Sequence, residues 1–295
     1  MKKSPVFLLF MVFALGLVVA CGSPSSDQVV IEEEASTAVE PSLTFLWETA
    51  ADLITNESVH FEPSNGKIYV ANIEGGPAEK DGVGSISIIS RDGEIVEREW
   101  VKGLHAPKGM TVMDGKLYVT DVDVLVEVDL ASGEILNRYE VENAQFLNDA
   151  DTDGKRVYFS DMRAGRILYF ENGAIRVFTD NQPNINGLRV GPDGVLYGLD
   201  AEGLKMYRSD GTFELLNDVV TGGDGLILLD ENTFLATRWK GEIYLIRDGK
   251  ETLLLDTSAE ESNTADVGFI PGENIVLVPT FFKNKVVAYR LDYRF

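Results

Sequence analysis

The segment Gly115-Lys-Leu-Tyr-Val-Thr-Asp121 carries the pattern that decides the fold: a turn glycine, a short strand-forming run and a closing polar residue. Each copy follows a turn sequence such as Asp114-Gly115, which is typical of a hairpin. Weaker copies at residues 233–238 and 275–280 bring the number of repeats to six. The other clear copies are Gly66-Lys-Ile-Tyr-Val-Ala-Asn72, Gly154-Lys-Arg-Val-Tyr-Phe-Ser-Asp161 and Gly194-Val-Leu-Tyr-Gly-Leu-Asp200.

A further apolar run follows each copy, and the first five repeats then continue through another turn into an outer run, such as residues 95–100. Short strands that recur about every 40 residues are typical of a propeller in which each repeat forms one blade. We therefore predict an all-β fold, a six-bladed β-propeller with four-stranded antiparallel blades.

The sixth repeat ends after its third strand, at residues 285–291. The apolar run Leu43-Thr-Phe-Leu-Trp-Glu48 lies upstream of the first repeat and is able to supply the missing outer strand. Such pairing would close the ring and remove an exposed sheet edge. The alternative is that residues 43–48 are an irregular lead-in.

The N-terminal region reads as a secretion and anchoring segment. Lys2 and Lys3 precede the apolar stretch of residues 6–20, which is typical of a signal peptide and short for a membrane span. Leu17-Val-Val-Ala-Cys21-Gly22 resembles the bacterial lipobox, which implies cleavage before Cys21 and lipidation of that cysteine. We predict a lipoprotein signal peptide at 1–20, a flexible acidic and Ser-rich tether at 21–41 and a single propeller domain at 42–295.

These features also predict the location and the partners. We expect a monomer in the bacterial cell envelope, lipid-anchored and facing the periplasm. No aspartate follows Cys21 directly, which favours the outer membrane. The formal net charge of −22 argues against nucleic acid as a partner and against contact with anionic lipid other than through the anchor. It is compatible with cation binding, and the alternative is an acidic, solvated surface.

A polar residue precedes the first strand of every repeat, at steps of 38 to 51 residues. In a ring of blades these positions would meet at the mouth of the central channel. They are Glu57, Lys108, Asn148, Asn186, Asp224 and Asp266.

Four of these residues suit a hard divalent cation. Glu57, Asn148, Asn186 and Asp224 supply carboxylate and amide oxygens, which Ca²⁺ prefers. The chain has two histidines and one cysteine, a composition that argues against a zinc site. The alternative is that these residues only cap turns at the strand starts.

Four motifs in order also resemble a known family, and the resemblance covers about residues 50–295. It is the senescence-marker-protein/gluconolactonase family of six-bladed propellers, also called regucalcin-like. The resemblance implies that Glu57, Asn186 and Asp224 bind a divalent metal, that Asn148 contacts metal or substrate, and that Asp224 is the general base. The motifs are Asn56-Glu57-Ser58, Asn148-Asp149 followed by Asp151 and Gly154, Asn186-Gly187-Leu188, and Asp224-Gly225-Leu226.

The chain departs from the family at several positions. Phe146 stands where the lactonase subgroup usually has an arginine, which argues against sugar-acid recognition and makes an apolar substrate edge an equal alternative. Lys108 and Asp266 complete the ring, and Lys108 is suited to pair with a carboxylate or to hold an anionic substrate. If the second strands end at the same mouth, their last residues line an outer pocket, where Arg238 and Trp239 are candidates for substrate contacts. The alternative is that they are ordinary strand-end residues.

Two functions remain open at this stage. The first is a metal-dependent hydrolase of the gluconolactonase, lactonase or esterase type, with the cation at the channel mouth, a small-molecule substrate and Asp224 as base. The second is a non-catalytic propeller that binds a small molecule, a peptide or a protein.

Overall fold

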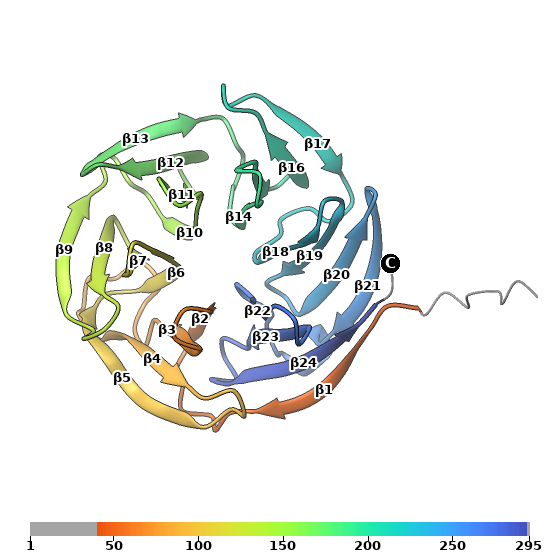
Figure 1. Cartoon of the computed structure of the whole chain (residues 1–295), viewed down its shortest axis with the longest axis horizontal. Coiled ribbons are helices and arrows are strands. Elements are labelled where there is room, and N and C mark those ends of the chain that lie inside the picture. The colour runs from red at the N-terminus through yellow and green to blue at the C-terminus, as the bar shows by residue number, and fades with distance from the viewer. Residues whose placement is uncertain (1–39, 294–295) are drawn as a thin grey trace, which may run out of the picture. The chain divides into compact units, whose positions relative to one another are not determined.

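Six four-stranded antiparallel sheets form a ring in the computed structural model, which describes residues 40–293 (Figure 1). The predicted signal peptide, Cys21 and nearly all of the predicted tether lie outside the described residues. Within the described part of the chain, the single helical element is the short 3-10 helix η1 (Ser258–Glu260), and no helix is long and apolar enough to cross a membrane. The prediction of a six-bladed propeller is confirmed.

Each blade runs from an inner strand at the channel to an outer strand at the perimeter. The first three blades are β2 (Asn56–Glu62), β3 (Lys67–Asn72), β4 (Gly84–Ile89) and β5 (Ile95–Leu104); β6 (Pro107–Met113), β7 (Lys116–Asp121), β8 (Val124–Asp129) and β9 (Ile135–Glu140); and β10 (Leu147–Thr152), β11 (Val157–Asp161), β12 (Arg166–Glu171) and β13 (Ala174–Thr179).

The last three blades follow the same order. They are β14 (Leu188–Val190), β15 (Leu196–Leu199), β16 (Leu204–Tyr207) and β17 (Phe213–Asn217); β18 (Leu226–Asp230), β19 (Thr233–Arg238), β20 (Glu242–Arg247) and β21 (Lys250–Asp256); and β22 (Gly268–Ile270), β23 (Ile275–Pro279), β24 (Val286–Asp292) and β1 (Ser42–Glu48).

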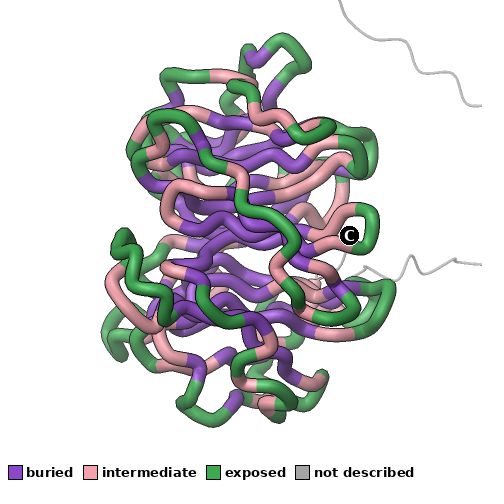
Figure 2. The backbone as a smooth tube through the Cα atoms, turned by 90° about the vertical axis from the view of Figure 1, so that its left-hand side faces the viewer, coloured by how far each residue is buried: buried purple, intermediate pink, exposed green. Residues whose placement is uncertain are grey.

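The core lies between neighbouring blades, so each sheet is buried on both faces. In β3, Ile68 and Val70 pack toward the sixth blade, whereas Tyr69 and Ala71 pack toward the second blade. Successive side chains of a strand point to opposite faces, and a strand that is covered on both sides reads as a continuous apolar run. Figure 2 shows the buried positions along the strands and the exposed positions mainly in the connecting loops.

Strand β1 closes the ring by pairing antiparallel with β24, from Ser42 opposite Asp292 to Glu48 opposite Val287. Trp47 packs on the apolar cluster between the sixth and first blades, and its ring lies against Gly93. The predicted closing strand is therefore confirmed.

We expect Trp47→Ala to lower the free energy of unfolding by about 3 kcal/mol, because the change leaves a cavity where the closing strand meets the core. The matched control is Leu46→Ala on the same strand, whose side chain is exposed and whose loss should change stability by less than about 0.5 kcal/mol. Urea unfolding of both variants measures the difference. Equal losses would contradict the anchoring role of Trp47.

Candidate functional site

A cavity of about 500 Å³ opens at one end of the central channel, and all six blades contribute to its lining. Five of the six residues predicted to meet at the channel mouth line it, and so does Phe146. The five are Glu57, Lys108, Asn148, Asn186 and Asp224.

Local irregularities of the inner strands aim these side chains. The β2–β3 register shifts between Asn56 and Ser58, which places Glu57 at a bulge. Lys108 and Asn148 lie within the equivalent shifts of the second and third blades. Bulges commonly redirect side chains next to functional sites. In the next two blades, Asn186 and Asp224 precede the inner strand by two residues.

Asp266 does not belong to this ring, and its predicted place there is wrong by one residue. In the fifth blade, Asp224 N–H donates to the carbonyl of Thr237. In the sixth blade, the equivalent hydrogen bond is donated by Ala265 N–H to the carbonyl of Pro279. Asp266 therefore matches Gly225 and also Asp149 of the third blade. A shift of one residue turns a side chain to the other side, so Asp266 faces a different part of the channel.

Asp149 and Asp266 instead line a second cavity, of about 210 Å³, at the other end of the inner strands, together with His60 and Arg189. Glycine occupies the matching position in the second, fourth and fifth blades. A Cβ on Gly187 would lie 2.1 Å from the carbonyl oxygen of Asp224, so only glycine permits this approach of neighbouring inner strands.

Two buried oxygens in the first cavity lack partners. Glu57 Oε2 and Asn186 Oδ1 are buried without a hydrogen bond, although buried polar atoms are nearly always paired. Asn186 Nδ2 donates to Asp224 Oδ1 at 2.8 Å, which leaves the amide oxygen free to bind a ligand.

Burial and mutual repulsion disfavour ionisation of the acids in the channel. Burial raises the pKa of Glu57 well above its ordinary value; Asp224 and Asp149 raise it further, whereas Lys108 lowers it. Burial and then Asp149 raise the pKa of Asp224 to about 7, and the hydrogen bond from Asn186 opposes this shift. Burial likewise raises the pKa of Asp149 to about 6 and that of Asp266 well above its ordinary value. Carboxylates crowded in this way favour a bound cation or a bound proton.

Lys108 is an almost fully buried cation at the edge of these acids. Burial lowers its pKa to about 8, against the opposing effect of Glu57. Its Nζ donates to the carbonyl of Ala106 at 2.9 Å and lies 4.5 Å from the centre of the Phe146 ring. An ammonium has three donors, so two remain for a substrate oxygen.

The residues at the ends of the second strands do not line the cavity, contrary to the expected outer pocket. Asp161 accepts hydrogen bonds from the N–H groups of Gln145 and Phe146 and pairs with Arg166. Asp121 likewise accepts hydrogen bonds from the N–H groups of His105 and Ala106, which lie just before Lys108. Asp121 and Asp161 are therefore positioning groups for the segments that carry Lys108, Phe146 and Asn148.

Arg238 is also absent from the lining. Its guanidinium donates to the carbonyl oxygens of Thr221 and Val219 and pairs with Glu242. Trp239, the other candidate at this strand end, does line the cavity. The remaining apolar lining was not predicted: Ile73, Pro77, Met162, Phe281 and Phe282.

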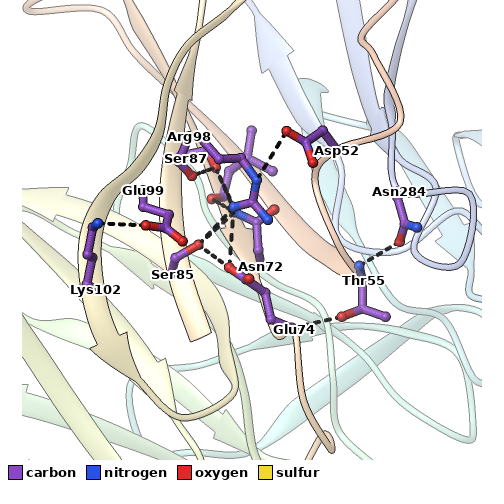
Figure 3. Close-up of polar contacts among 11 residues, drawn as sticks. Asp52, Thr55, Asn72, Glu74, Ser85, Ser87, Arg98, Glu99, Lys102 and Asn284 are labelled. Carbon is purple, nitrogen blue, oxygen red and sulfur yellow. Dashed lines mark hydrogen bonds and ion pairs between the residues drawn. The ribbon is translucent and has the colours of Figure 1, made fainter. Parts of the chain in front are cut away.

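A polar network holds one side of the cavity rim in place (Figure 3). Thr55 N–H donates to Asn284 Oδ1 at 2.8 Å, and Glu74 N–H donates to Thr55 Oγ1 at 2.9 Å. Arg98 pairs with Glu74 at 3.3 Å. These bonds connect the first blade to the sixth-blade loop that carries Phe281 and Phe282.

The donor set fits a hard divalent cation better than it fits zinc. Within residues 40–293, no group of three or more His, Cys, Asp and Glu side chains is placed to hold a metal ion. Glu57 and Asp224 are the only carboxylates in the lining, and Asn148 and Asn186 supply the amides. Ca²⁺ accepts such neutral oxygens and completes its shell with water.

No family model and no curated protein matches the chain. Solved structures do match. A protein assigned as a gluconolactonase has a TM-score of 0.62 and 17% identity over 88% of this chain and 94% of its own. Regucalcin from Agrobacterium tumefaciens, a calcium-binding protein, has a TM-score of 0.60 and 15% identity over 87% of this chain and 98% of its own.

Virginiamycin B lyase from Staphylococcus aureus, solved with quinupristin, has a TM-score of 0.60 and 16% identity over 86% of this chain and 100% of its own. These matches establish the shared propeller fold. They include the kind of protein that the sequence motifs resemble, and also an enzyme of a different class.

We expect Asp224→Asn to change how stability depends on pH in the absence of divalent cations. The pKa of Asp224 is about 7 in the folded protein and about 4 when unfolded. Its contribution to stability is present below pH 4 and is lost as pH rises through 7. The free energy of unfolding of the wild type, relative to that of the variant, should therefore fall by up to roughly 4 kcal/mol between pH 4 and 8.

Urea unfolding in EDTA at several pH values measures this loss. Asp218→Asn, at an exposed position, is the control and should follow the wild type. A constant difference between wild type and Asp224→Asn across this range would contradict the burial of an ionisable carboxyl.

Proposed function

We propose that the chain is a divalent-metal-dependent hydrolase of the lactonase or esterase type. Glu57, Asn148, Asn186 and Asp224 would hold the cation, which we expect to be Ca²⁺. The observation that carries this proposal is the pair of unpartnered buried oxygens, Glu57 Oε2 and Asn186 Oδ1, in one cavity. The similarity in fold to a calcium-binding regucalcin and to a gluconolactonase-type protein supports it.

When bound, a cation of this kind polarises an ester carbonyl and stabilises the developing oxyanion. The side chains of the protein supply the rest. Asp224 is the proposed general base, and its carboxylate would take a proton from the attacking water. Asn186 orients the carboxylate through the 2.8 Å hydrogen bond, and Lys108, which lines the same cavity, would donate to a substrate oxygen.

A lyase among the matched structures offers a different chemistry for comparison. The S. aureus structure is a catalytically inactive variant in which a histidine is replaced by alanine. The two histidines of the present chain are His60 and His105, and neither lines the first cavity. Hydrolysis at the oxygen-donor site therefore fits better than histidine-dependent lyase chemistry.

Ca²⁺ should stabilise the folded protein. The Glu57→Gln variant should bind Ca²⁺ with a Kd at least tenfold higher than that of the wild type. A ligand at 100 times its Kd adds about 2.7 kcal/mol of stability, which thermal unfolding detects readily. Asp218→Asn serves as the matched control for removal of one negative charge. The cation site is disproved if Ca²⁺, Mg²⁺ and Mn²⁺ all leave the wild-type melting temperature unchanged.

Turnover of aryl esters and lactones should require both the cation and Asp224. We expect Asp224→Asn to lower kcat/KM by about 10²- to 10⁴-fold, the usual contribution of a positioned base. The readout is hydrolysis with and without EDTA. Activity that survives both the substitution and the chelator would exclude the proposed mechanism.

A non-catalytic propeller that binds a small molecule, a peptide or a protein is the second candidate. The observation that favours it is the pair of exposed aromatic side chains, Trp239 and Phe282, beside the cavity. Exposed aromatic surface is common at binding sites. Cation binding without turnover on any ester or lactone would favour this candidate.

We also propose that Cys21 is lipidated and tethers the propeller to the bacterial outer membrane, facing the periplasm. The lipobox-like sequence before Cys21 supports this location. The lipid would be joined to the Cys21 sulfur through a thioether bond, which a serine hydroxyl cannot form.

We expect Cys21→Ser to move the protein from the membrane fraction to the soluble fraction, whereas the control Ser26→Ala stays with the membrane. Cell fractionation and metabolic labelling with a fatty acid measure the two effects. Labelled Cys21→Ser protein would rule out lipidation at this residue.

A further inference from the structure

An aromatic cluster stands on one side of the first cavity. Trp239, Phe281 and Phe282 contact one another edge to face, with ring centres 4.8 to 5.7 Å apart. Trp239 is 41% exposed and Phe282 is 60% exposed, yet both line the cavity. Aromatic faces left open to a cavity are suited to an apolar, planar ligand group.

The backbone that presents this cluster is strained. Phe281 has φ of 48°, which is rare for a bulky residue. The turn is held by the hydrogen bond from Asn284 N–H to the carbonyl of Phe281, at 3.1 Å, and by a bridge between Phe281 and Asn56. Such strain persists only where the surroundings enforce it, and it is concentrated at functional sites.

A cation stands on the opposite side of the ring of blades. Arg163 lies in the loop between β11 and β12 of the third blade, across the channel from the sixth blade (Figure 1). Its guanidinium lies 4.3 Å from the centre of the Phe146 ring, which lines the cavity. Arg163 is exposed and makes no hydrogen bond or ion pair with any residue between 40 and 293. An unpaired guanidinium is a ready partner for a carboxylate.

We propose that the cavity takes an elongated amphipathic anion, with an aromatic or other apolar group on Trp239, Phe281 and Phe282 and a carboxylate on Arg163. The middle of such a molecule passes over Glu57, Asn186 and Asp224. The substrate class is then an apolar ester or lactone that carries a carboxylate at its far end. This assignment of a substrate rests on the proposed hydrolase function, whereas the binding preference does not.

Binding of unreactive probes tests the proposal apart from catalysis. The probes are 6-phenylhexanoate, its amide and hexanoate, titrated calorimetrically into the purified full chain in EDTA. Wild type should bind 6-phenylhexanoate about fivefold to tenfold more tightly than the amide or hexanoate. Arg163→Gln should reduce the preference for the acid over the amide by about threefold, with Lys108 still beside Phe146, and Arg163→Lys should restore part of the preference. Arg176→Gln, an exposed arginine on the outer strand of the same blade, should behave as wild type.

The aromatic side has its own variant. Phe282→Ala should weaken both phenyl probes by about fivefold and leave hexanoate unchanged, because the lost contact is with the phenyl group. Equal binding of acid and amide by wild type, or an undiminished preference in Arg163→Gln, overturns the anion assignment. Equal binding of 6-phenylhexanoate and hexanoate overturns the aromatic assignment, and so does the absence of binding by all probes. A preference for 6-phenylhexanoate in a protein without esterase activity would disprove only the hydrolase.

Discussion

The burial of both faces of every blade is the constraint on which this structure depends. In β3, Ile68 and Val70 require a neighbour on one side, and Tyr69 and Ala71 require one on the other. A row of such sheets leaves apolar surface at each end unless it closes into a ring. The pairing of β1 with β24 completes the last sheet, and Trp47 covers the junction between the last blade and the first. Closure also brings the six inner strands around one axis, so packing of the core determines where the site lies.

The same closure has an electrostatic cost at the axis. Glu57 and Asp224 face the first cavity, while Asp149 and Asp266 face the second, and all four are buried. Lys108 and Arg189 offset part of this charge, because they act on Glu57 and on the Asp149–Asp266 pair respectively. Uncompensated buried carboxylates are unfavourable for folding, and functional sites are where proteins commonly tolerate them.

The rim differs from the axis in chemistry. Phe146, Trp239, Phe281 and Phe282 surround a polar floor with apolar surface. Propellers of similar fold include a calcium-binding protein and a lyase, so the fold leaves the reaction open. In this chain, the floor suits a cation and the rim suits an apolar ligand. The two parts come from different elements: inner strands and the residues just before them form the floor, and loops form most of the rim.

The sequence by itself determined the number of blades, the closing strand and five of the six positions at the channel mouth. Short apolar runs and turn residues recur in each repeat, and Glu57, Lys108, Asn148, Asn186 and Asp224 keep nearly constant spacing from them. Such local signals can be read from the sequence alone, because they do not depend on how the blades pack against one another.

Only the tertiary structure decided the remaining features. It placed Ala265 where Asp266 was expected, because a one-residue difference in register leaves no mark in the sequence. It turned Arg238 toward backbone carbonyls, brought Phe281 and Phe282 into the cavity lining and placed Arg163 against Phe146. These placements depend on loops from blades far apart in sequence, and their positions are set by how the closed ring packs.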